Sequence, residues 1–285
     1  ALTRKDYMAA ASMASGMLSN ITAVDEGRRK SGRSVVAQSY SRVGAVGLTI
    51  DEDSPLAPLL QAALSLRLGD QELAIETYNA NRALFDQHRD EVPADLVLFV
   101  CQRHIAAGGD ENHDRVEDIL RSWVVKNSES KQFDDQTKAK VQLLLASNFA
   151  KAQRYDLAHN EYTTVKNRYP KTPQAIEAEF GIGETFLAQK VYDQAELVFE
   201  KLANSRELDV VIRAEFLRGV LSHRRGDRDE ARAIFRAVLD RVPSIQLANQ
   251  ALYSLSEVYR DEERYIDQLN LLRTVGRLGR NSKRT

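Results

Sequence analysis

Cys101, His104 and His113 are the residues whose types and spacing could hold a metal ion. Cys101 and His104 are three residues apart, so on a helix they would share one face, and His113 follows a pair of glycines. Thiolate and imidazole are ligands that zinc prefers. The alternative is a buried cysteine on an apolar helix beside two surface histidines, and we adopt that interpretation. The sequence therefore predicts no metal and no cofactor.

The motifs of common enzyme classes do not occur in the sequence. It contains no P-loop, Gly-rich dinucleotide turn, His-Glu-x-x-His or Gly-x-Ser-x-Gly, and the segment 44–47 (GAVG) is too short to bind phosphate. The acidic pairs 134–135 and 262–263 are adjacent in sequence, so their side chains would point to different sides of a helix. Nothing here organises a nucleophile, a base and an oxyanion site. We therefore expect that the chain is not an enzyme.

Charge and composition exclude further classes. The 285 residues include 40 basic and 41 acidic side chains, whereas a general nucleic-acid binder needs a basic surplus to displace counterions from phosphates. No apolar run approaches the ~20 residues that span a bilayer, so we expect no transmembrane segment. The run 28–30 (RRK) is either an exposed loop or a contact for an acidic partner or membrane surface. One cysteine allows no intrachain disulfide.

The strongest signal in the sequence is an internal repeat in the C-terminal half. Four copies can be read, at residues 141–170, 178–202, 214–243 and 251–275. Their corresponding residues Ala158, Ala195, Ala231 and Gln268 are 37, 36 and 37 residues apart. Two helices of about 13 to 15 residues with two short turns need about that length. The pattern therefore predicts stacked helix pairs.

The residue types within each copy agree with close helix packing. Small residues recur where two helices must approach, at Ala146, Gly183, Gly219 and Ser256. Aromatic residues recur between neighbouring pairs, at Phe149, Phe186 and Tyr259 on the first helices and at Tyr162, Phe199 and Phe235 on the second. The pair 172–173 (TP) reads as an N-cap followed by a first-turn proline, and the pair 226–227 (GD) reads as a break between two helices. One pair cannot bury both of its faces, so the pairs must stack.

These residues resemble the pattern of the tetratricopeptide repeat family. The third copy matches it with Gly219, Gly226, Ala231, Phe235, Val238 and Pro243, and the first with Ala146, Phe149, Ala158, Tyr162, Val165 and Pro170. The second copy lacks the late proline, and the fourth has Gln268 in place of alanine. The resemblance implies an all-α fold, a right-handed α-solenoid of antiparallel helix pairs that forms a superhelix.

The rest of the chain is assigned more coarsely. Residues 54–131 read as two divergent helix pairs, with breaks at 69–70 (GD) and 108–109 (GG) and with one helix over the segment ELAIETYNANRALF. Residues 132–279 hold the four pairs. Residues 1–53 read as a capping helix, with all three methionines on it, followed by an irregular connection. Residues 280–285 form a basic tail.

The resemblance also implies where a partner would bind. In this family the first helix of each pair lines the concave face of the superhelix. The matching positions are Lys140, Leu143, Ser147, Lys151, Phe180, Glu184, Arg213, Phe216, Val220, His223, Arg224, Gln250, Tyr253, Glu257 and Arg260. Leu143, Phe180, Phe216 and Tyr253 recur with the repeat, and either contact a ligand or pack against adjacent first helices. The lysine and asparagine with which chaperone-binding members hold a carboxylate are missing here.

The sequence thus predicts a non-enzymatic protein–protein interaction scaffold that binds a segment of another protein on its concave surface, without nucleic acid. Two alternatives stay open: a structural subunit that assembles by stacking or self-association, and an accessory domain of a larger protein. The pattern is similar to that of bacterial repeat proteins of the Tol-Pal and outer-membrane assembly kind. That resemblance favours the periplasm or cell envelope over the cytoplasm.

Overall fold

The computed structural model describes residues 54–131, 133–241 and 244–281. In these ranges the chain forms α-helices joined by short turns, and no β-strand occurs. The all-α class predicted from the sequence is therefore confirmed. The predicted capping helix with Met8, Met13 and Met17, the irregular connection after it, and Pro243 lie outside the described residues.

The chain divides into two compact units, Ala1–Ala152 and Gln153–Thr285. The described part of the N-terminal unit contains helices α3 (Ala57–Arg67), α4 (Gln71–Ala80), α5 (Arg82–His88), α6 (Ala94–Ala107), α7 (Asp110–Asn127) and α8 (Asp135–Lys151). That of the C-terminal unit contains α9 (Tyr155–Arg168), α10 (Pro173–Ala188), α11 (Tyr192–Ala203), α12 (Leu208–Arg225), α13 (Arg228–Asp240), α14 (Ile245–Asp261) and α15 (Tyr265–Asn281).

The N-terminal unit is built from helices that pack on their sequence neighbours. Helix α3 packs on α4, and α6 packs on α7, while α3 and α8 both contact α6 as well. Trp123 and Phe85 are among the largest fully buried side chains. The break predicted after α3 is confirmed, because Gly69 has a φ of +83° and the Asp70 carboxylate accepts a hydrogen bond from the Leu73 backbone N–H at 3.0 Å.

The prediction of one helix from Glu72 to Phe85 is wrong. The segment breaks at Asn81, whose backbone leaves the helical region and whose side-chain amide donates to the Thr77 carbonyl oxygen at 2.8 Å. Asparagine competes with helical hydrogen bonding in this way. The additional short helix α5 contributes to the 42-residue spacing from Ala74 to Val116, which is longer than that of the later copies.

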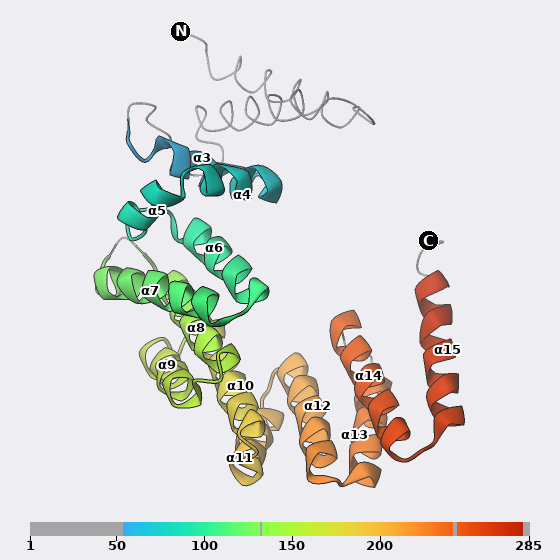
Figure 1. The fold of residues 1–285 in the computed structure, drawn as a ribbon. Helices are drawn as coiled ribbons and strands as arrows, with labels where there is room; N and C mark the ends of the chain where they lie inside the picture. The colour runs from blue at the N-terminus through green and yellow to red at the C-terminus, as the bar shows by residue number, and fades with distance from the viewer. Residues whose placement is uncertain (1–53, 132, 242–243, 282–285) are drawn as a thin grey trace. The chain divides into compact units, whose positions relative to one another are not determined.

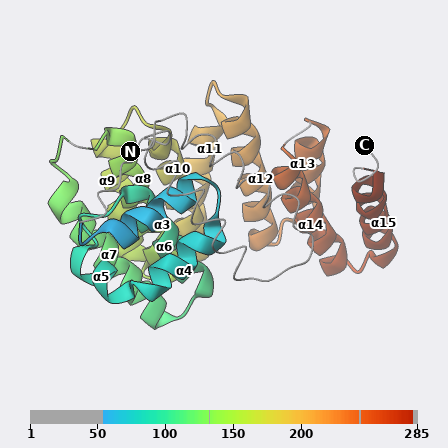
Figure 2. The same ribbon diagram turned by 90° about the horizontal axis from the view of Figure 1, so that it is seen from above.

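In the C-terminal unit, each helix from α9 to α15 packs on the next, and α12 also contacts α10 and α14. Figures 1 and 2 both show α12 to α15 as successive neighbours. A core cluster of this unit runs from α10 to α14 and includes Phe180, Phe199, Phe216 and Phe235. Each buried phenylalanine stabilises the fold by about 1.5–3 kcal/mol.

The close helix approach predicted at the small residues is confirmed for two glycines. A Cβ atom added to Gly183 would overlap the ring of Phe199, and one added to Gly219 would lie 2.7 Å from Cε1 of Phe235. Both rings are fully buried and belong to the second helix of the same pair. Glycine at these positions therefore sets the distance between the two helices.

The turn inside each pair uses a left-handed residue at the same point. Gln153, Lys190, Gly226 and Glu263 have φ values of +59°, +62°, +96° and +58°, and they are 37, 36 and 37 residues apart. After three of them, the next backbone N–H bonds to a carbonyl five residues back, from Val191 to Phe186, Asp227 to Ser222 and Arg264 to Tyr259, each at 2.9 Å. This is the Schellman closure of a helix end. Only the third copy has glycine there, as its predicted break required.

The predicted cap at Thr172 is correct in position but not in its hydrogen bond. Thr172 is the N-cap of α10 and Pro173 is its first residue, yet no N–H of the helix bonds to the threonine side chain. The hydroxyl instead donates backwards to the Tyr169 carbonyl oxygen at 2.8 Å. It thereby joins the end of α9 to the start of α10.

Candidate ligand-binding groove

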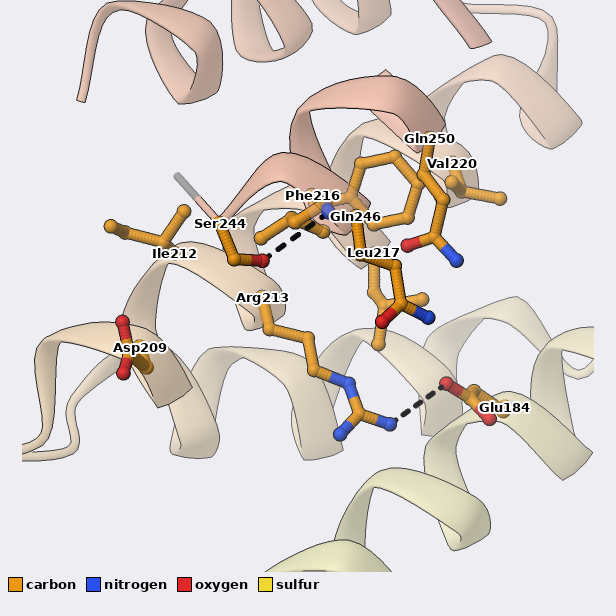
Figure 3. A pocket seen from close by; sticks show the side chains of 11 residues that line it. Glu184, Asp209, Ile212, Arg213, Phe216, Leu217, Val220, Ser244, Gln246 and Gln250 are labelled. Atoms are coloured by element: carbon orange, nitrogen blue, oxygen red, sulfur yellow. Dashed lines mark hydrogen bonds and ion pairs between the residues drawn. The ribbon is translucent and has the colours of Figure 1, made fainter. Parts of the chain in front are cut away.

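One face of α12 forms a wall of a cavity of about 640 Å³ in the C-terminal unit. Its lining comes from three first helices of successive pairs: Glu184 from α10; Asp209, Ile212, Arg213, Phe216, Leu217 and Val220 from α12; and Ser244, Gln246, Leu247 and Gln250 at the start of α14. Figure 3 shows these side chains, and we call the cavity the α12 groove.

Helical periodicity explains why these residues meet. The α12 residues recur at intervals of three or four, so they share one face of the helix. On α14 the hydroxyl oxygen of Ser244 accepts a hydrogen bond from the Leu247 backbone N–H at 3.3 Å, which fixes the first turn. Gln246 and Gln250 are one turn apart, and both side chains are exposed beside the groove.

Arg213 is held from three sides. Its Nη1 donates to Glu177 at 2.9 and 2.8 Å, and its Nη2 lies 3.5 Å from Glu184 Oε1. The guanidinium carbon also lies 4.0 Å from the centre of the Phe180 ring. Arg213 thus links α12 to α10, and its charge is already engaged by two carboxylates.

Glu184 is the groove carboxylate that contacts Arg213, at the long distance of 3.5 Å. The surrounding protein desolvates it and raises its pKa, while the charge of Arg213 lowers the pKa and that of Glu177 raises it further. Solvent still reaches 48% of its side-chain surface, so the group is open to a ligand. Asp209 lies in the first turn of α12, is exposed, and forms no ion pair among the described residues.

Five of the residues predicted to contact a partner line the α12 groove: Glu184, Arg213, Phe216, Val220 and Gln250. Phe180 is buried beneath Arg213 and does not line it. The recurring aromatic position therefore has no uniform role, because Phe180 and Phe216 are buried and Tyr253 is exposed.

The other predicted residues of the C-terminal unit lie outside the groove lining. His223 Nε2 lies 2.9 Å from Asp261 Oδ2, which joins α12 to the end of α14, and this hydrogen bond lowers the pKa of Asp261. Glu257 forms an ion pair with Arg260 on the same helix, and Arg224 is exposed.

The four predicted residues on α8 belong to the N-terminal unit. Lys140 lines a cavity of about 610 Å³ with residues of α3, α6 and the segment before α8. That cavity also contains the Arg67–Asp95 ion pair, in which Arg67 Nε lies 2.6 Å from Asp95 Oδ2. Leu143 and Ser147 are half-buried, and Lys151 is exposed.

The sequence interpretation missed six lining residues of the α12 groove, namely Asp209, Ile212, Leu217, Ser244, Gln246 and Leu247. Two of them could have been found from spacing. Asp209 is one turn before Arg213, and Gln246 is one turn before Gln250, so each pair shares a helix face. Both residues precede the repeat copies that begin at residues 214 and 251. Helices α12 and α14 begin earlier than those copies, at Leu208 and Ile245.

The structure agrees with the adopted interpretation of Cys101, His104 and His113 in one respect and differs from it in another. Cys101 is buried as predicted, and its pKa is raised to about 12 by burial. His113, however, is also buried and not a surface residue: its Nδ1 lies 2.8 Å from Asn148 Oδ1. His104 Nδ1 lies 2.7 Å from Asn112 Oδ1. Within the described ranges no three potential ligands gather around a common point.

Comparisons with known proteins support the repeat. The model of the tetratricopeptide repeat family matches residues 143–208 and 216–272. No curated protein matches the chain. No helix in the described part of the chain is long and apolar enough to cross a bilayer.

Solved structures share the fold at low identity. The chain is similar to the apo form of RapI, with 13% identity, a TM-score of 0.57, and 94% of this chain and 75% of that chain covered. A Rap protein complexed with competence and sporulation factor gives 14% identity, a TM-score of 0.55 and the same coverage. The fold is thus that of a helical-repeat solenoid, and the two matched segments carry tetratricopeptide repeats.

Proposed function

We propose that this chain is a non-enzymatic scaffold that binds a segment of a partner protein in the α12 groove. The observation that carries the proposal is the groove itself: α12 supplies an apolar wall of Ile212, Phe216, Leu217 and Val220, and the neighbouring first helices α10 and α14 add polar side chains at its margin. Concave sites with apolar linings and a few polar groups are where ligands bind. The fold shared with a Rap protein solved in complex with competence and sporulation factor supports the proposal.

The test uses one residue of the groove and its neighbour on the same helix. Gln250→Trp places a large side chain in the groove, whereas Asn249→Trp places the same side chain about 100° around α14, outside the lining. Both residues are exposed, so neither substitution disturbs the core. Thermal melting and far-ultraviolet circular dichroism check that both variants fold.

The probe is a phage library of random peptides selected on the unmodified chain. We expect selected peptides to bind the Asn249→Trp variant normally and the Gln250→Trp variant at least about tenfold more weakly in fluorescence anisotropy. Peptides that bind both variants equally would show that the groove is not the binding surface.

A second candidate function, assembly with another copy of the chain, has its own observation. Helix α15 carries Ile266 and Leu269, and both side chains are exposed, that of Ile266 to 78%. The corresponding residues of α11 are Asp193 and Glu196, which pair with Arg225 at the end of α12. Helix α15 thus has apolar side chains at the positions where α11 forms ion pairs with the next first helix, α12.

The assembly candidate is tested by restoring the charged residues of α11. The double variant Ile266→Asp with Leu269→Glu copies the aligned residues of a pair that folds in the same unit. If these residues mediate self-association, light scattering coupled to gel filtration shows a concentration-dependent dimer for the unmodified chain and a monomer for the variant. A monomer at all concentrations for both proteins refutes this candidate.

A further inference from the structure

The α12 groove has an excess of negative charge around its only basic residue. The lining contains two carboxylates, those of Glu184 and Asp209, and a third, that of Glu177, is bonded to Arg213 from just outside. The site therefore holds three carboxylates and one guanidinium, and two of the carboxylates, those of Glu177 and Glu184, contact the guanidinium. In Figure 3, Glu184 and Asp209 lie on opposite sides of Arg213.

Arg213 is not available to a ligand anion. Its Nη1 is taken up by both oxygens of Glu177, at 2.9 and 2.8 Å, and its planar group covers the Phe180 ring. An incoming carboxylate or phosphate would have to break these contacts and would meet the charge of Glu184. The groove is thus electrostatically unfavourable for an acidic segment.

Glu184 has room for a cation. Its nearest basic group, Arg213 Nη2, is 3.5 Å away and is the more weakly bonded end of that guanidinium. The desolvation that raises the pKa of Glu184 is a cost that a second positive charge would offset. Apolar side chains of Phe216 and Val220 line the same cavity, so the stem of a basic side chain would find apolar contacts there.

We propose that the segment bound in the α12 groove carries a lysine or arginine whose cation pairs with Glu184, next to an apolar residue that contacts the wall formed by Phe216, Leu217 and Val220. The exposed amides of Gln246 and Gln250 are placed to bond the backbone of such a segment. Asp209 adds attraction at the other side of Arg213. This inference rests on the proposed function, because it names the chemistry of the partner at the same site.

The chain offers a closely matched control for Glu184. Glu200 on α11 is 49% exposed and lies 4.0 Å from Arg218, whereas Glu184 is 48% exposed and lies 3.5 Å from Arg213. Both arginines belong to α12, but Glu200 and Arg218 are not part of the groove lining. Glu184→Gln and Glu200→Gln therefore remove the same charge from equally exposed places.

The experiment selects a random-peptide phage library in parallel on the unmodified chain, on Glu184→Gln and on Glu200→Gln. We expect lysine and arginine to be enriched beside an apolar residue on the unmodified chain and on Glu200→Gln, but not on Glu184→Gln. A synthesised selected peptide should bind Glu184→Gln roughly fivefold more weakly, and replacing its basic residue by alanine should weaken binding to the unmodified chain but add little to the loss in Glu184→Gln. The difference in affinity between the unmodified chain and Glu184→Gln should decrease as the salt concentration rises.

The outcomes separate this inference from the proposed function. Selected peptides that are blocked by Gln250→Trp but are acidic, or lack basic residues, overturn the inference and leave the groove function standing. Equal binding by Glu184→Gln and Glu200→Gln overturns it as well. Peptides that Gln250→Trp does not block overturn both.

Discussion

The guanidinium of Arg213 lies 4.0 Å from the centre of the Phe180 ring while its Nη1 bonds to Glu177. This one side chain therefore covers an aromatic ring of the core and joins two successive first helices. A guanidinium does both because it is planar and carries its charge over several nitrogens.

We expect Arg213→Ala to destabilise the fold by about 1–2 kcal/mol, because it uncovers Phe180 and leaves Glu177 and Glu184 without their cation. Arg213→Lys should fall in between, since it keeps the charge but not the planar contact. The control is Arg218→Ala, because Arg218 is 35% exposed against 34% for Arg213 and meets one carboxylate at 4.0 Å. Urea denaturation measures all three, and equal losses for both alanine variants would contradict the special role of Arg213.

Replacing Gly183 by alanine should destabilise the chain, although alanine is the better helix former by about 1 kcal/mol. The added methyl group would overlap the fully buried Phe199 ring, and overpacking of this kind costs about 1–3 kcal/mol. Adding Phe199→Leu should recover part of the loss in thermal melting. A Gly183→Ala variant that is more stable than the unmodified chain would refute the close approach.

The left-handed turn residues predict a stabilising substitution. Lys190 has a φ of +62° where the third copy has glycine, so Lys190→Gly should raise the free energy of unfolding by about 0.5–1 kcal/mol. Its neighbour Gln189 has a φ of −75°, and Gln189→Gly should lower that free energy by a similar amount. Chemical denaturation of the two variants distinguishes the turn geometry from a general effect of glycine, which would have the same sign at both positions.

His159 should make the C-terminal unit less stable in weak acid. Desolvation lowers the pKa of His159, with Asp156 opposing, and its ring packs against Phe186 at 4.2 Å between centres. Because the folded-state pKa is below the unfolded value near 6.5, the unfolded chain binds the proton first. The contribution of neutral His159 to the free energy of unfolding is therefore complete above about pH 6.5. It decreases as the pH falls from about 6.5 towards the folded-state pKa. Melting temperatures from pH 7.5 down to 5 should fall less for His159→Phe, and an unchanged pH profile would contradict this assignment.

Cys101 should be unreactive in the folded chain. The thiol is fully buried, and desolvation raises its pKa to about 12, so the thiolate that attacks disulfide reagents is scarce at neutral pH. We expect its reaction with an aromatic disulfide to be at least ~100-fold slower in buffer than in guanidinium chloride. Rapid native-state labelling would show that α6 opens readily.

Much of the C-terminal fold could be predicted because a repeat constrains the same residue in several places. Gly183 and Gly219 were assigned to close contacts from spacing alone, and both lie against a buried ring. The break at Asn81 could not be predicted in this way, since it depends on one side-chain hydrogen bond in a segment that is otherwise apolar at helical intervals.

The groove was predicted only in part for a related reason. Repeat positions identify which face of a first helix is shared, and this gave Arg213, Phe216 and Val220. They do not show that Arg213 covers Phe180, because that contact depends on the conformation of a long side chain. The balance of charge around Glu184 likewise arises from two helices together, α10 and α12.

His113 and Asn148 are joined by two hydrogen bonds, one between side chains at 2.8 Å and one from the Asn148 amide to the His113 carbonyl oxygen at 2.9 Å, across 35 residues of sequence. Each residue thus supplies a hydrogen-bond partner for buried polar atoms of the other. Truncated versions of the N-terminal unit must therefore retain both α7 and α8 to stay folded and soluble. A fragment ending at Asn127 would leave an imidazole without its amide, and we expect it to be prone to aggregation and proteolysis.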